Sequence, residues 1–445
     1  GWLWVGVFFF IYFFIFFPAK TAFFSFIHPA GWGATTPARR VVAPYAISSN
    51  CSTKQVKGVM FPMYNVKLYN KISKVGLDDL DPAKYTCSED FEDYDAVLVR
   101  SAKLHDVQFP KSLKCIARAG AGVNNIPLDR CAEEGIVVFN TPGANANAVK
   151  ELVVCALLLA SRKVVQGANW VKSLAGTPDI GPAAEKGKAT YAGPEIAGKK
   201  LGIIGLGAIG VKVANAAVGL DMEVWGYDPF LSVDGALALS RSVKHVTELD
   251  EIFANCDYIT IHVPLNADTR NTISAEAIEK MKDGVRIINL ARGELVDTKA
   301  MAAALESGKV AAYVSDFASD EILAQENAVT LPHLGASTPE SEDNCAKMAV
   351  KEIRDFLETG TIRNSVNFPN LKVPYEGGYR ICMIHKNIPN MIASITSTVK
   401  CNIENMGNRS KGDYAYTIVD AAEQPTEENL DSLRAIEGMI SVRTI

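Results

Sequence analysis

Short hydrophobic runs alternate with stretches of helical periodicity in the first part of the chain. Runs rich in apolar and β-branched residues predict strands at residues 58–61, 96–100, 115–118 and 136–139. Pro127 and Gly135 bracket a predicted helix before the last of these, because proline favours a helix start and glycine follows a helix end. A longer helical pattern follows at residues 147–172. This alternation predicts a parallel sheet whose faces are covered by helices.

A second alternating set begins near residue 200. Its predicted strands are 201–204, 222–226, 242–246, 257–263, 285–290, 310–315 and 328–331. Amphipathic helical stretches lie between them, which is typical of the doubly wound dinucleotide-binding fold. The Gly-, Pro-, Ala- and Lys-rich stretch 175–194 predicts a surface loop before this set.

The C-terminal part has a different pattern. Residues 368–378 form a predicted Pro/Gly linker. The elements predicted after it are strand 379–384, helix 389–400, strands 401–409 and 414–420, helix 426–439 and strand 440–445. This βαββαβ order predicts a ferredoxin-like module.

The N-terminal stretch differs from the rest in composition. Residues 2–17 are almost wholly apolar, slightly short of the roughly 20 residues that span a membrane, and no basic region precedes them. Residues 29–46 lack acids and contain Arg39 and Arg40, as transit segments do. We expect residues 1–53 to be a presequence outside the fold, with a mis-called start or a membrane anchor as alternatives. The expected location is a plastid or mitochondrion, or the cytoplasm if the start is mis-called, with no membrane attachment in the mature form.

Composition narrows the classes of function. The 445 residues suggest two or three domains. With 45 Lys and Arg against 50 Asp and Glu, the chain lacks the basic excess typical of nucleic-acid binding, so we expect no nucleic-acid partner. Nine cysteines without CxxC spacing argue against a disulfide framework or a metal site and fit a reducing compartment.

A glycine motif follows the predicted strand 201–204. Gly205, Gly207 and Gly210 have G-x-G-x-x-G spacing, which suits a tight turn, a close approach of pyrophosphate and close helix packing. Asp228 lies at the end of the next predicted strand, where a carboxylate binds ribose hydroxyls and repels a 2′-phosphate. The motif therefore favours NAD over NADP; the competing interpretation is a plain turn at Asp228-Pro229.

Three further residues lie after strands of the second set, where ligands bind in open α/β sheets. Hydride removal from a 2-hydroxy acid needs a cation for the carboxylate, a base for the hydroxyl proton and an acid that orients the base. Arg292, His333 and Glu321 supply these groups. Each of them alone has an ordinary structural explanation, and the prediction rests on their joint placement.

The glycine motif with Asp228, residues 289–293, the acid after Asp316 and residues 332–338 resemble the D-2-hydroxyacid dehydrogenase family. Further segments resemble its phosphoglycerate dehydrogenases, namely 99–102, 118–125, 140–142 and 364–369. The resemblance implies an α/β fold in which a Rossmann NAD domain is inserted in a flavodoxin-like substrate domain, followed by a ferredoxin-like ACT regulatory domain. The implied limits are 54–151 with 334–368 for the substrate domain, 152–333 for the NAD domain and 378–445 for the ACT domain.

The same resemblance implies site residues. Arg292 binds substrate, His333 is the acid/base and Glu321 tunes it. The implied NAD contacts are Gly205, Gly207, Ala208, Ile209, Gly210, Asp228, Val263, Leu290, Ala291, Asp316, Gly335 and Ala336. The loop after Asp316 is shorter than the family's, so Asp320 remains an alternative to Glu321.

The implied reaction is NAD-dependent oxidation of 3-phospho-D-glycerate to 3-phosphohydroxypyruvate, the first step of phosphorylated L-serine biosynthesis. The substrate phosphate needs cations from the other lobe. The candidates are Arg100, Lys103 and Arg118, with Ser101 and Asn145 as neutral donors. An exposed strand end is the alternative interpretation of Arg100 and Lys103.

The resemblance to ACT domains implies L-serine as an effector bound by His385, Asn387 and Asn402, and a homo-oligomer, either dimer or tetramer. The family has glycine where this chain has Asn390, so dimerisation without an effector stays open. The rival functions are glycerate/hydroxypyruvate reductase, D-lactate dehydrogenase, an NAD-sensing binding protein and, from residues 2–17 alone, a membrane-anchored interaction protein.

Overall fold

The computed structural model describes residues 63–445. The predicted strand 58–61, the expected presequence 1–53 and the apolar stretch 2–17 lie outside the described residues. Within residues 63–445, no helix has both the length and the apolar character needed to cross a membrane.

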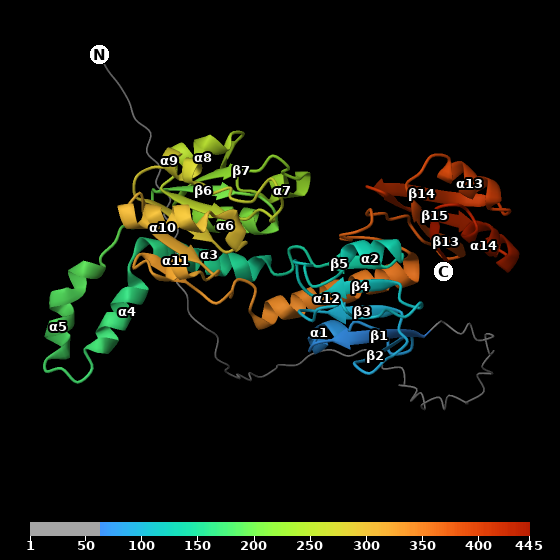
Figure 1. The fold of residues 1–445 in the computed structure, drawn as a ribbon, viewed down its shortest axis with the longest axis horizontal. Coiled ribbons are helices and arrows are strands. Elements are labelled where there is room, and N and C mark those ends of the chain that lie inside the picture. The colour runs from blue at the N-terminus through green and yellow to red at the C-terminus, as the bar shows by residue number, and fades with distance from the viewer. Residues whose placement is uncertain (1–62) are drawn as a thin grey trace, which may run out of the picture. The chain divides into compact units, whose positions relative to one another are not determined.

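The first sheet is parallel throughout, with the strand order β2-β1-β3-β4-β5 (Figure 1). Its strands are β1 (Tyr64–Tyr69), β2 (Tyr85–Ser88), β3 (Ala96–Val99), β4 (Cys115–Arg118) and β5 (Val137–Asn140). This is the flavodoxin-like order that was expected. β1 and β2 were not predicted, because their YNVKLY and YTCS sequences contain too few consecutive apolar residues to stand out.

Alternate residues of the central strands point to opposite faces of this sheet, and both faces are covered. Ala96 and Leu98 belong to a core with α12 (Pro339–Thr359), whereas Val97 and Val99 pack in the core that contains Cys131 of α2 (Leu128–Glu133). The short helix α1 (Lys74–Leu77) packs on α12. β3 is therefore buried along its whole length, as parallel strands usually are.

The second sheet has seven parallel strands in the order β12-β11-β10-β9-β6-β7-β8. They are β6 (Lys200–Ile204), β7 (Glu223–Tyr227), β8 (Lys244–Val246), β9 (Tyr258–Ile261), β10 (Val285–Asn289), β11 (Val310–Ser315) and β12 (Ala328–Thr330). All seven predicted strands are confirmed to within a few residues. The order in which strands are added reverses between β6 and β9, which creates the crevice where such sheets bind ligands.

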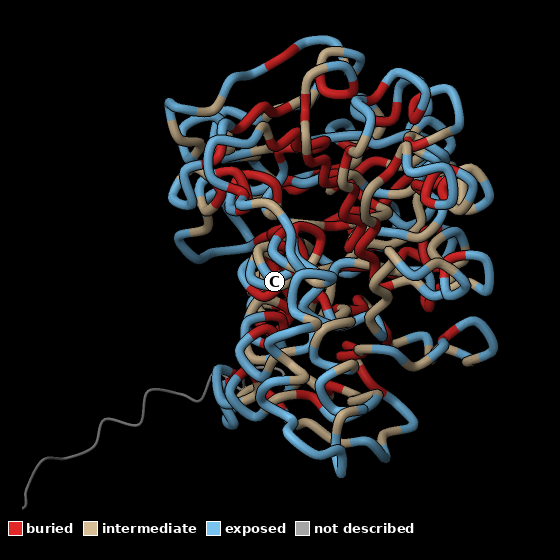
Figure 2. Tube along the Cα trace, turned by 90° about the vertical axis from the view of Figure 1, so that its left-hand side faces the viewer, coloured by how far each residue is buried: buried red, intermediate tan, exposed pale blue. Residues whose placement is uncertain are grey.

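Helices cover both faces of the second sheet (Figure 1). One face packs on α3 (Ala146–Ser161) and α6 (Ala208–Val218). The other helices that follow its strands are α7 (Val233–Ala238), α8 (Leu249–Asn255), α9 (Ala275–Lys280), α10 (Thr298–Ser307) and α11 (Asp320–Leu323). In Figure 2 the buried segments lie toward the inside of the trace and the exposed segments lie around them.

Two predictions for the segment between the sheets were wrong. The helix expected at 147–172 is interrupted, because Arg162 has an extended backbone between α3 and α4 (Val164–Ser173). The loop expected at 175–194 contains α5 (Ile180–Gly187) and a short 3₁₀ turn. Trp170 of α4 stacks on Tyr191 with ring centroids 5.1 Å apart, so a tertiary contact orders a stretch whose composition favours a loop.

The third sheet confirms the βαββαβ module. Its elements are β13 (Tyr379–Lys386), α13 (Met391–Thr398), β14 (Ile403–Lys411), β15 (Tyr414–Ala421), α14 (Glu427–Arg434) and β16 (Met439–Thr444). The antiparallel order is β14-β15-β13-β16. Ile381 and Met383 pack toward α13 and α14, whereas Cys382 and Ile384 on the opposite face join the core of the first sheet.

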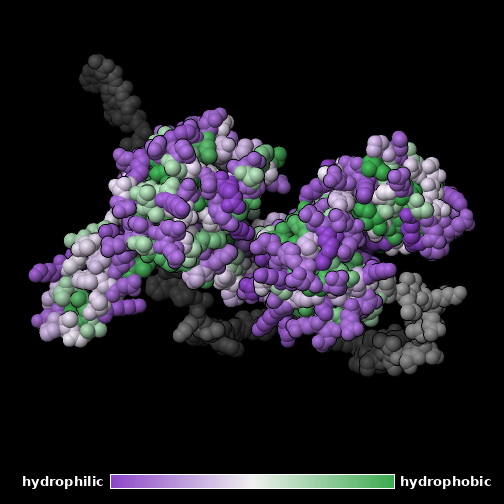
Figure 3. All heavy atoms as spheres, in the orientation of Figure 1, coloured by the Kyte–Doolittle hydropathy of each residue, from purple (hydrophilic) through white to green (hydrophobic). Residues whose placement is uncertain are grey.

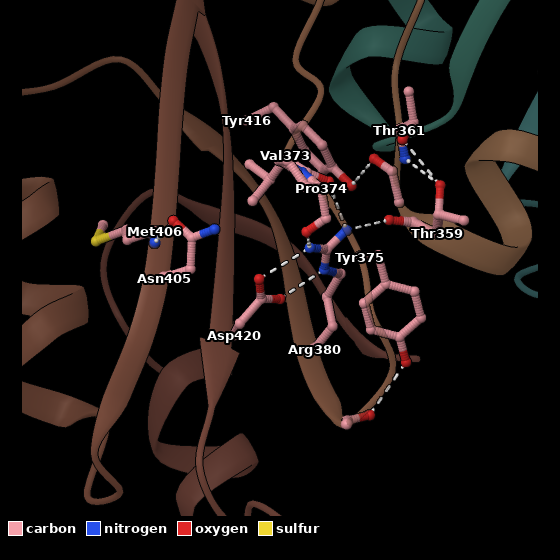
Figure 4. Close-up of polar contacts among 12 residues, drawn as sticks. Thr359, Thr361, Val373, Pro374, Tyr375, Arg380, Asn405, Met406, Tyr416 and Asp420 are labelled. Atoms are coloured by element: carbon pink, nitrogen blue, oxygen red, sulfur yellow. Dashed lines mark hydrogen bonds and ion pairs between the residues drawn. The ribbon is translucent and has the colours of Figure 1, made fainter.

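The predicted linker 368–378 has no regular element except a bridge at Leu371, but it is packed rather than free. The fully buried Arg380 pairs with Asp420 through Nε–Oδ1 at 2.6 Å and Nη2–Oδ2 at 2.9 Å (Figure 4). Its Nη1 donates to the carbonyl of Thr359 at 2.7 Å, and its Nη2 donates to that of Pro374 at 2.8 Å. One guanidinium thus joins the third sheet, the linker and the end of α12.

α12 also contains a buried acid, Glu352, which is 5% exposed. Its Oε1 accepts a hydrogen bond from Asn364 at 2.7 Å, and its Oε2 has no partner among the described residues. Burial raises the pKa of Glu352 to about 8. The hydrogen bond from Asn364 and the charges of Lys351 and Arg363 lower this pKa, but their effect is weaker than that of burial. The carboxyl group is therefore neutral in the folded protein near pH 7.

We predict that Glu352→Gln stabilises the protein increasingly as the pH rises. Glu352 has a folded pKa near 8 against an ordinary value of 4.5, so its ionisation favours unfolding progressively between these pH values and fully above them. Glutamine keeps the acceptor and cannot ionise. The advantage should grow from pH 5 to pH 8 and then level off at on the order of 2–4 kcal/mol.

Thermal unfolding of both proteins at pH 5 to 9 measures this difference. Glu340→Gln, an exposed change in the first turn of the same helix, is the control and should show no such growth. Equal destabilisation by Glu352→Gln at every pH would show that the carboxyl group is not held neutral.

Candidate functional site

One cavity of about 980 Å³ collects the loops that follow strands of the first and second sheets. From the first sheet it is lined by Arg100 after β3, by residues 118–124 at the end of β4 and by Pro142, Gly143 and Asn145 after β5. From the second it is lined by loops after β6, β9, β10, β11 and β12. All of these are carboxyl ends of parallel strands, where open α/β sheets bind ligands.

The glycine loop between β6 and α6 has the geometry that its motif predicts. Gly205 has φ +95°, and a Cβ at Gly210 would overlap the carbonyl oxygen of Gly205. Gly207 has no atom within 4 Å of such a Cβ and lines the cavity with Ala208 and Ile209. The first N–H groups of α6 thus have open space before them, as an anion at a helix start requires.

Asp228 supports this loop from the end of β7. Its Oδ2 accepts a hydrogen bond from the N–H of Leu206 at 2.8 Å, and its Oδ1 accepts one from that of Phe230 at 2.8 Å. Asp228 is half-buried and does not line the cavity, and neither do Gly205 and Gly210. The remaining predicted cofactor residues all line it, namely Val263, Leu290, Ala291, Asp316, Gly335 and Ala336.

Asp316 is buried at the end of β11, with 3% of its surface exposed. Its Oδ2 accepts a hydrogen bond from the N–H of Gly335 at 3.2 Å, while its buried Oδ1 has no partner among the described residues. Burial raises the pKa of this carboxyl group. The hydrogen bond from the Gly335 N–H and the charges of His333 and Arg292 act in the opposite direction, but more weakly. An orphaned acceptor at a cavity wall suits a donor from a bound molecule, such as an amide N–H₂.

Two guanidinium groups face the cavity without an acid partner in the described residues. A Cβ at Gly122 would lie 3.0 Å from Arg292 Nη2 and 3.8 Å from Arg118 Nη1, so both cations lie beside one point. Arg118 Nε donates to the carbonyl of Arg100 at 3.0 Å, and Arg292 Nη1 donates to that of Ala291 at 2.6 Å. Burial lowers the pKa of Arg118, and the charge of Arg292 lowers it further. Arginine nevertheless stays charged in proteins.

The other predicted substrate residues divide into two groups. Arg100 and Asn145 line the cavity, and Arg100 Nη2 pairs with Glu342 Oε1 of α12 at 2.7 Å. Ser101 and Lys103 are exposed and do not line it. Lys71, Ser73 and Asn124 line it but were not predicted. Lys71 and Ser73 follow β1, so missing that strand also hid the side chains at its end.

His333 lines the cavity with a left-handed backbone at φ +43°. Its N–H donates to the carbonyl of Asp316 at 3.1 Å, and its ring centroid lies 5.0 Å from that of Phe317. Glu321 and Asp320 are exposed in the first turn of α11, outside the cavity lining, and neither is hydrogen-bonded to His333. The structure thus brings His333 and Arg292 to one cavity without the predicted acid.

His262 is a second histidine on the cavity wall and was not predicted. It follows β9, with Nε2 3.0 Å from Oγ1 of Thr260 and with no partner for the buried Nδ1 among the described residues. Burial lowers its pKa to about 4, so the imidazole is neutral at physiological pH. Its position at the carboxyl end of a predicted strand was the available sequence signal.

Comparison with known proteins places this arrangement in a family. Residues 154–337 match the NAD-binding domain of D-isomer specific 2-hydroxyacid dehydrogenases. D-3-phosphoglycerate dehydrogenase of Haemophilus influenzae is 32% identical over 346 residues, which are 73% of this chain and 79% of that protein. The chain belongs to the D-isomer-specific 2-hydroxyacid dehydrogenase family.

Other members of this family are similar over different lengths. The D-3-phosphoglycerate dehydrogenase of Archaeoglobus fulgidus is 37% identical over 289 residues, 63% of this chain. The chain spans about half the length of this relative, since the match covers 52% of it. The NAD⁺-bound 3-phosphoglycerate dehydrogenase of Entamoeba histolytica has a TM-score of 0.55 at 27% identity, covering 69% of this chain and all of that one. A glyoxylate reductase from Paecilomyes thermophila has a TM-score of 0.58 at 27% identity, and the match covers 69% of this chain and 99% of that one.

The three predicted effector residues do not meet in one chain. His385 is buried, with Nδ1 2.9 Å from the carbonyl of Lys386 and Nε2 2.8 Å from Oγ1 of Thr417. Exposed Asn387 donates to the carbonyl of Gly412 at 3.1 Å. Asn402 comes just before β14. The first residue of β14 pairs with the end of β15, and the end of β15 pairs with the start of β13. His385, in contrast, is near the end of β13. Asn402 and His385 therefore lie at opposite ends of the sheet.

For this dehydrogenase-family fold we predict that Gly207→Val weakens NAD binding without loss of stability. The new side chain has room in the structure, but it enters the cavity where a pyrophosphate would approach α6. The dissociation constant for NAD, measured by calorimetry, should rise at least about 10-fold, and the melting temperature should stay unchanged.

Gly219→Ala, at the other end of α6 and with only ordinary contacts around its Cβ, is the control. Gly210→Ala should differ from both by destabilising the fold, because its Cβ overlaps backbone. If Gly207→Val bound NAD as tightly as the wild type, the cofactor would have to lie elsewhere.

Proposed function

We propose that this chain catalyses the NAD-dependent oxidation of 3-phospho-D-glycerate to 3-phosphohydroxypyruvate, the first step of phosphorylated L-serine biosynthesis. The observation that carries the proposal is the pair of unpaired guanidinium groups, Arg118 and Arg292, in a cavity that also contains His333 and the glycine loop. The substrate has two anionic groups, and Lys71 adds further positive charge to the same walls, where Arg100 pairs with Glu342. The D-3-phosphoglycerate dehydrogenase relatives support this choice of substrate.

The residues of the cavity fit NAD. The N–H groups at the start of α6, with Gly207, would hold the pyrophosphate. Asp228, which lies outside the cavity lining at the end of β7, would accept from the adenosine ribose. The unpartnered Oδ1 of Asp316 would accept from the carboxamide. When bound, NAD accepts the hydride that leaves C2 of the substrate.

The remaining chemistry belongs to side chains of the chain itself. Arg292 would bind the substrate carboxylate in a bidentate manner and polarise the C2 oxygen. His333 would take the proton of the C2 hydroxyl as that oxygen becomes a carbonyl, and would return it in the reverse reaction. Arg118, with Lys71 and Arg100, would bind the phosphate.

We infer that Glu321, with Asp320 as the alternative, reaches His333 only when the site closes on substrate. Hydrogen bonds of catalytic groups are often absent before substrate binds, so the absence of a hydrogen bond from His333 to either acid is compatible with this role. The inferred domains are 54–151 with 334–368 for substrate, 152–333 for NAD and 378–445 for regulation. Closure would then bend the two connections near residues 141–145 and 334–338.

L-serine is the proposed effector of the third sheet, and a homo-oligomer is the proposed assembly. Because His385 and Asn402 lie at opposite ends of the sheet, a site containing both needs a second copy of the chain. Exposed apolar side chains on α4 and α5 support self-association (Figure 3), including Val164, Val171 and Ile180. The proposed location of the protein is a plastid or mitochondrion, or the cytoplasm; this proposal rests on the composition of residues 29–46.

A second candidate function is reduction of glyoxylate or hydroxypyruvate. One observation favours it: Glu342 already pairs with Arg100, which removes one of the cations that a phosphate would use. The glyoxylate reductase among the similar structures is consistent with this alternative.

The assay that decides the substrate follows NAD reduction by the full chain with 3-phosphoglycerate, D-glycerate and D-lactate. We expect kcat/KM for 3-phosphoglycerate to exceed that for D-glycerate at least about 100-fold, because charge-assisted hydrogen bonds to the phosphate each contribute about 1.5–3 kcal/mol. Equal rates with and without the phosphate would reject the proposed substrate.

Adding L-serine to the same assay tests the proposed effector, and an unchanged rate would reject L-serine as the effector.

A separate prediction concerns proton transfer. His333→Ala should lower kcat by about 10²–10⁴-fold while NAD still binds. If Glu321 is the partner acid, Glu321→Gln should lower kcat and change its pH profile, because the carboxylate stabilises the imidazolium that forms as His333 takes the proton. Asp320→Asn is the matched control and should leave the profile in place; the reverse result would assign Asp320 as the partner.

A further inference from the structure

A second cavity of about 480 Å³ lies beside α12 and is lined by cations that do not line the catalytic cavity. It is lined by Lys347, Lys351 and Arg354 of α12 and by Gly143 and Ala144 of the connection between β5 and α3. We call this cavity the crossover pocket. The cations that line the catalytic cavity, Arg118 and Arg292 among them, do not line the crossover pocket, so the two cavities have separate charges.

The three cations of the crossover pocket share one face of α12, since they are four and three residues apart. Lys351 pairs with Asp355 at 2.5 Å, and Arg354 Nη1 donates to the backbone carbonyl of Asp79 at 3.3 Å. Lys347 has no hydrogen bond or ion pair within residues 63–445. Asp79 is the single acid in the lining, so positive charge exceeds negative charge there.

Like charges spaced this way on a helix repel one another and destabilise it slightly. A bound anion would reverse that repulsion and could accept hydrogen bonds from the two ammonium groups and the guanidinium. The volume lies within the range of small-ligand sites and is too small for a polymer. The chemistry therefore suits a compact anion with several acceptor oxygens.

The position of the crossover pocket ties it to the catalytic cavity. Gly143 lines both cavities, and a Cβ there would lie 3.0 Å from the Cβ of Ala208, the first residue of α6. On α12, Glu342 and Ala346 line the catalytic cavity while Lys347 and Lys351 line the other. One loop and one helix thus separate the two cavities.

We propose that the crossover pocket is a binding site for a phosphate group, carried either by free phosphate or by a small phosphorylated metabolite. The bound anion contacts α12 and the β5–α3 connection together and so fixes their spacing. This site does not depend on the reaction that the catalytic cavity performs.

The test is calorimetric titration of the full chain with inorganic phosphate at constant ionic strength. The wild type should show two classes of site. Arg118→Gln should weaken the class that belongs to the catalytic cavity, and Lys347→Gln/Lys351→Gln should weaken the other at least about 10-fold. Both lysines are exposed, and losing the Lys351–Asp355 pair should change stability by less than about 0.5 kcal/mol.

Lys199→Gln/Lys299→Gln is the charge-matched control, because it removes two exposed lysines that do not line the pocket. It should bind phosphate like the wild type. If the pocket variant also binds like the wild type, or if the control loses affinity equally, there is no site at the crossover pocket.

Repeating the titration with glycerol 3-phosphate in the Arg118→Gln background identifies the source of the phosphate group. Tighter binding than inorganic phosphate indicates a phosphorylated metabolite, and equal binding indicates free phosphate. If neither compound binds in that background, the proposal is overturned. Because these titrations measure binding alone, a failed dehydrogenase assay would leave their outcome intact.

Discussion

Arg118 and Arg292 place two positive charges beside one point of the cavity wall, and no carboxylate among the described residues pairs with either of them. Two guanidinium groups this close repel each other unless solvent or an anion screens them. The loop after β4 makes room for them with Gly120 and Gly122, where any larger residue would meet one of the guanidinium groups. This part of the cavity wall therefore suits a negative ligand, in agreement with the proposed substrate.

α12 connects this cavity to the rest of the molecule. Its first turns carry Glu342 to the catalytic wall, and its opposite face carries Lys347 and Lys351 to the crossover pocket. At its other end, Arg380 binds the carbonyl of Thr359, and Tyr416 donates to the carbonyl of Gly360 at 2.8 Å (Figure 4). The last turn of α12 is thus held by buried groups of the third sheet.

Several expectations failed where a contact distant in sequence outweighed the local pattern. Residues 175–194 have the composition of a loop, yet the Trp170–Tyr191 stacking accompanies helix α5. β1 and β2 are held by pairing with neighbouring strands, although their own sequences are mixed. The missed strand β1 also explains why Lys71 was missed at the cavity. Conversely, Lys103 looked suitable by charge and spacing, but its side chain does not line the cavity.

The sequence by itself determined the alternation of strands and helices, the order of the three sheets along the chain and the glycine loop at the start of α6. These features depend on residues close together, through side-chain periodicity and the backbone freedom of glycine. Only the tertiary structure decided which strand ends meet, that His333 lies near Asp316 without a hydrogen bond to Glu321, and that Arg118 joins Arg292. Those outcomes depend on strand order and on the packing of segments far apart in sequence, which local patterns do not encode.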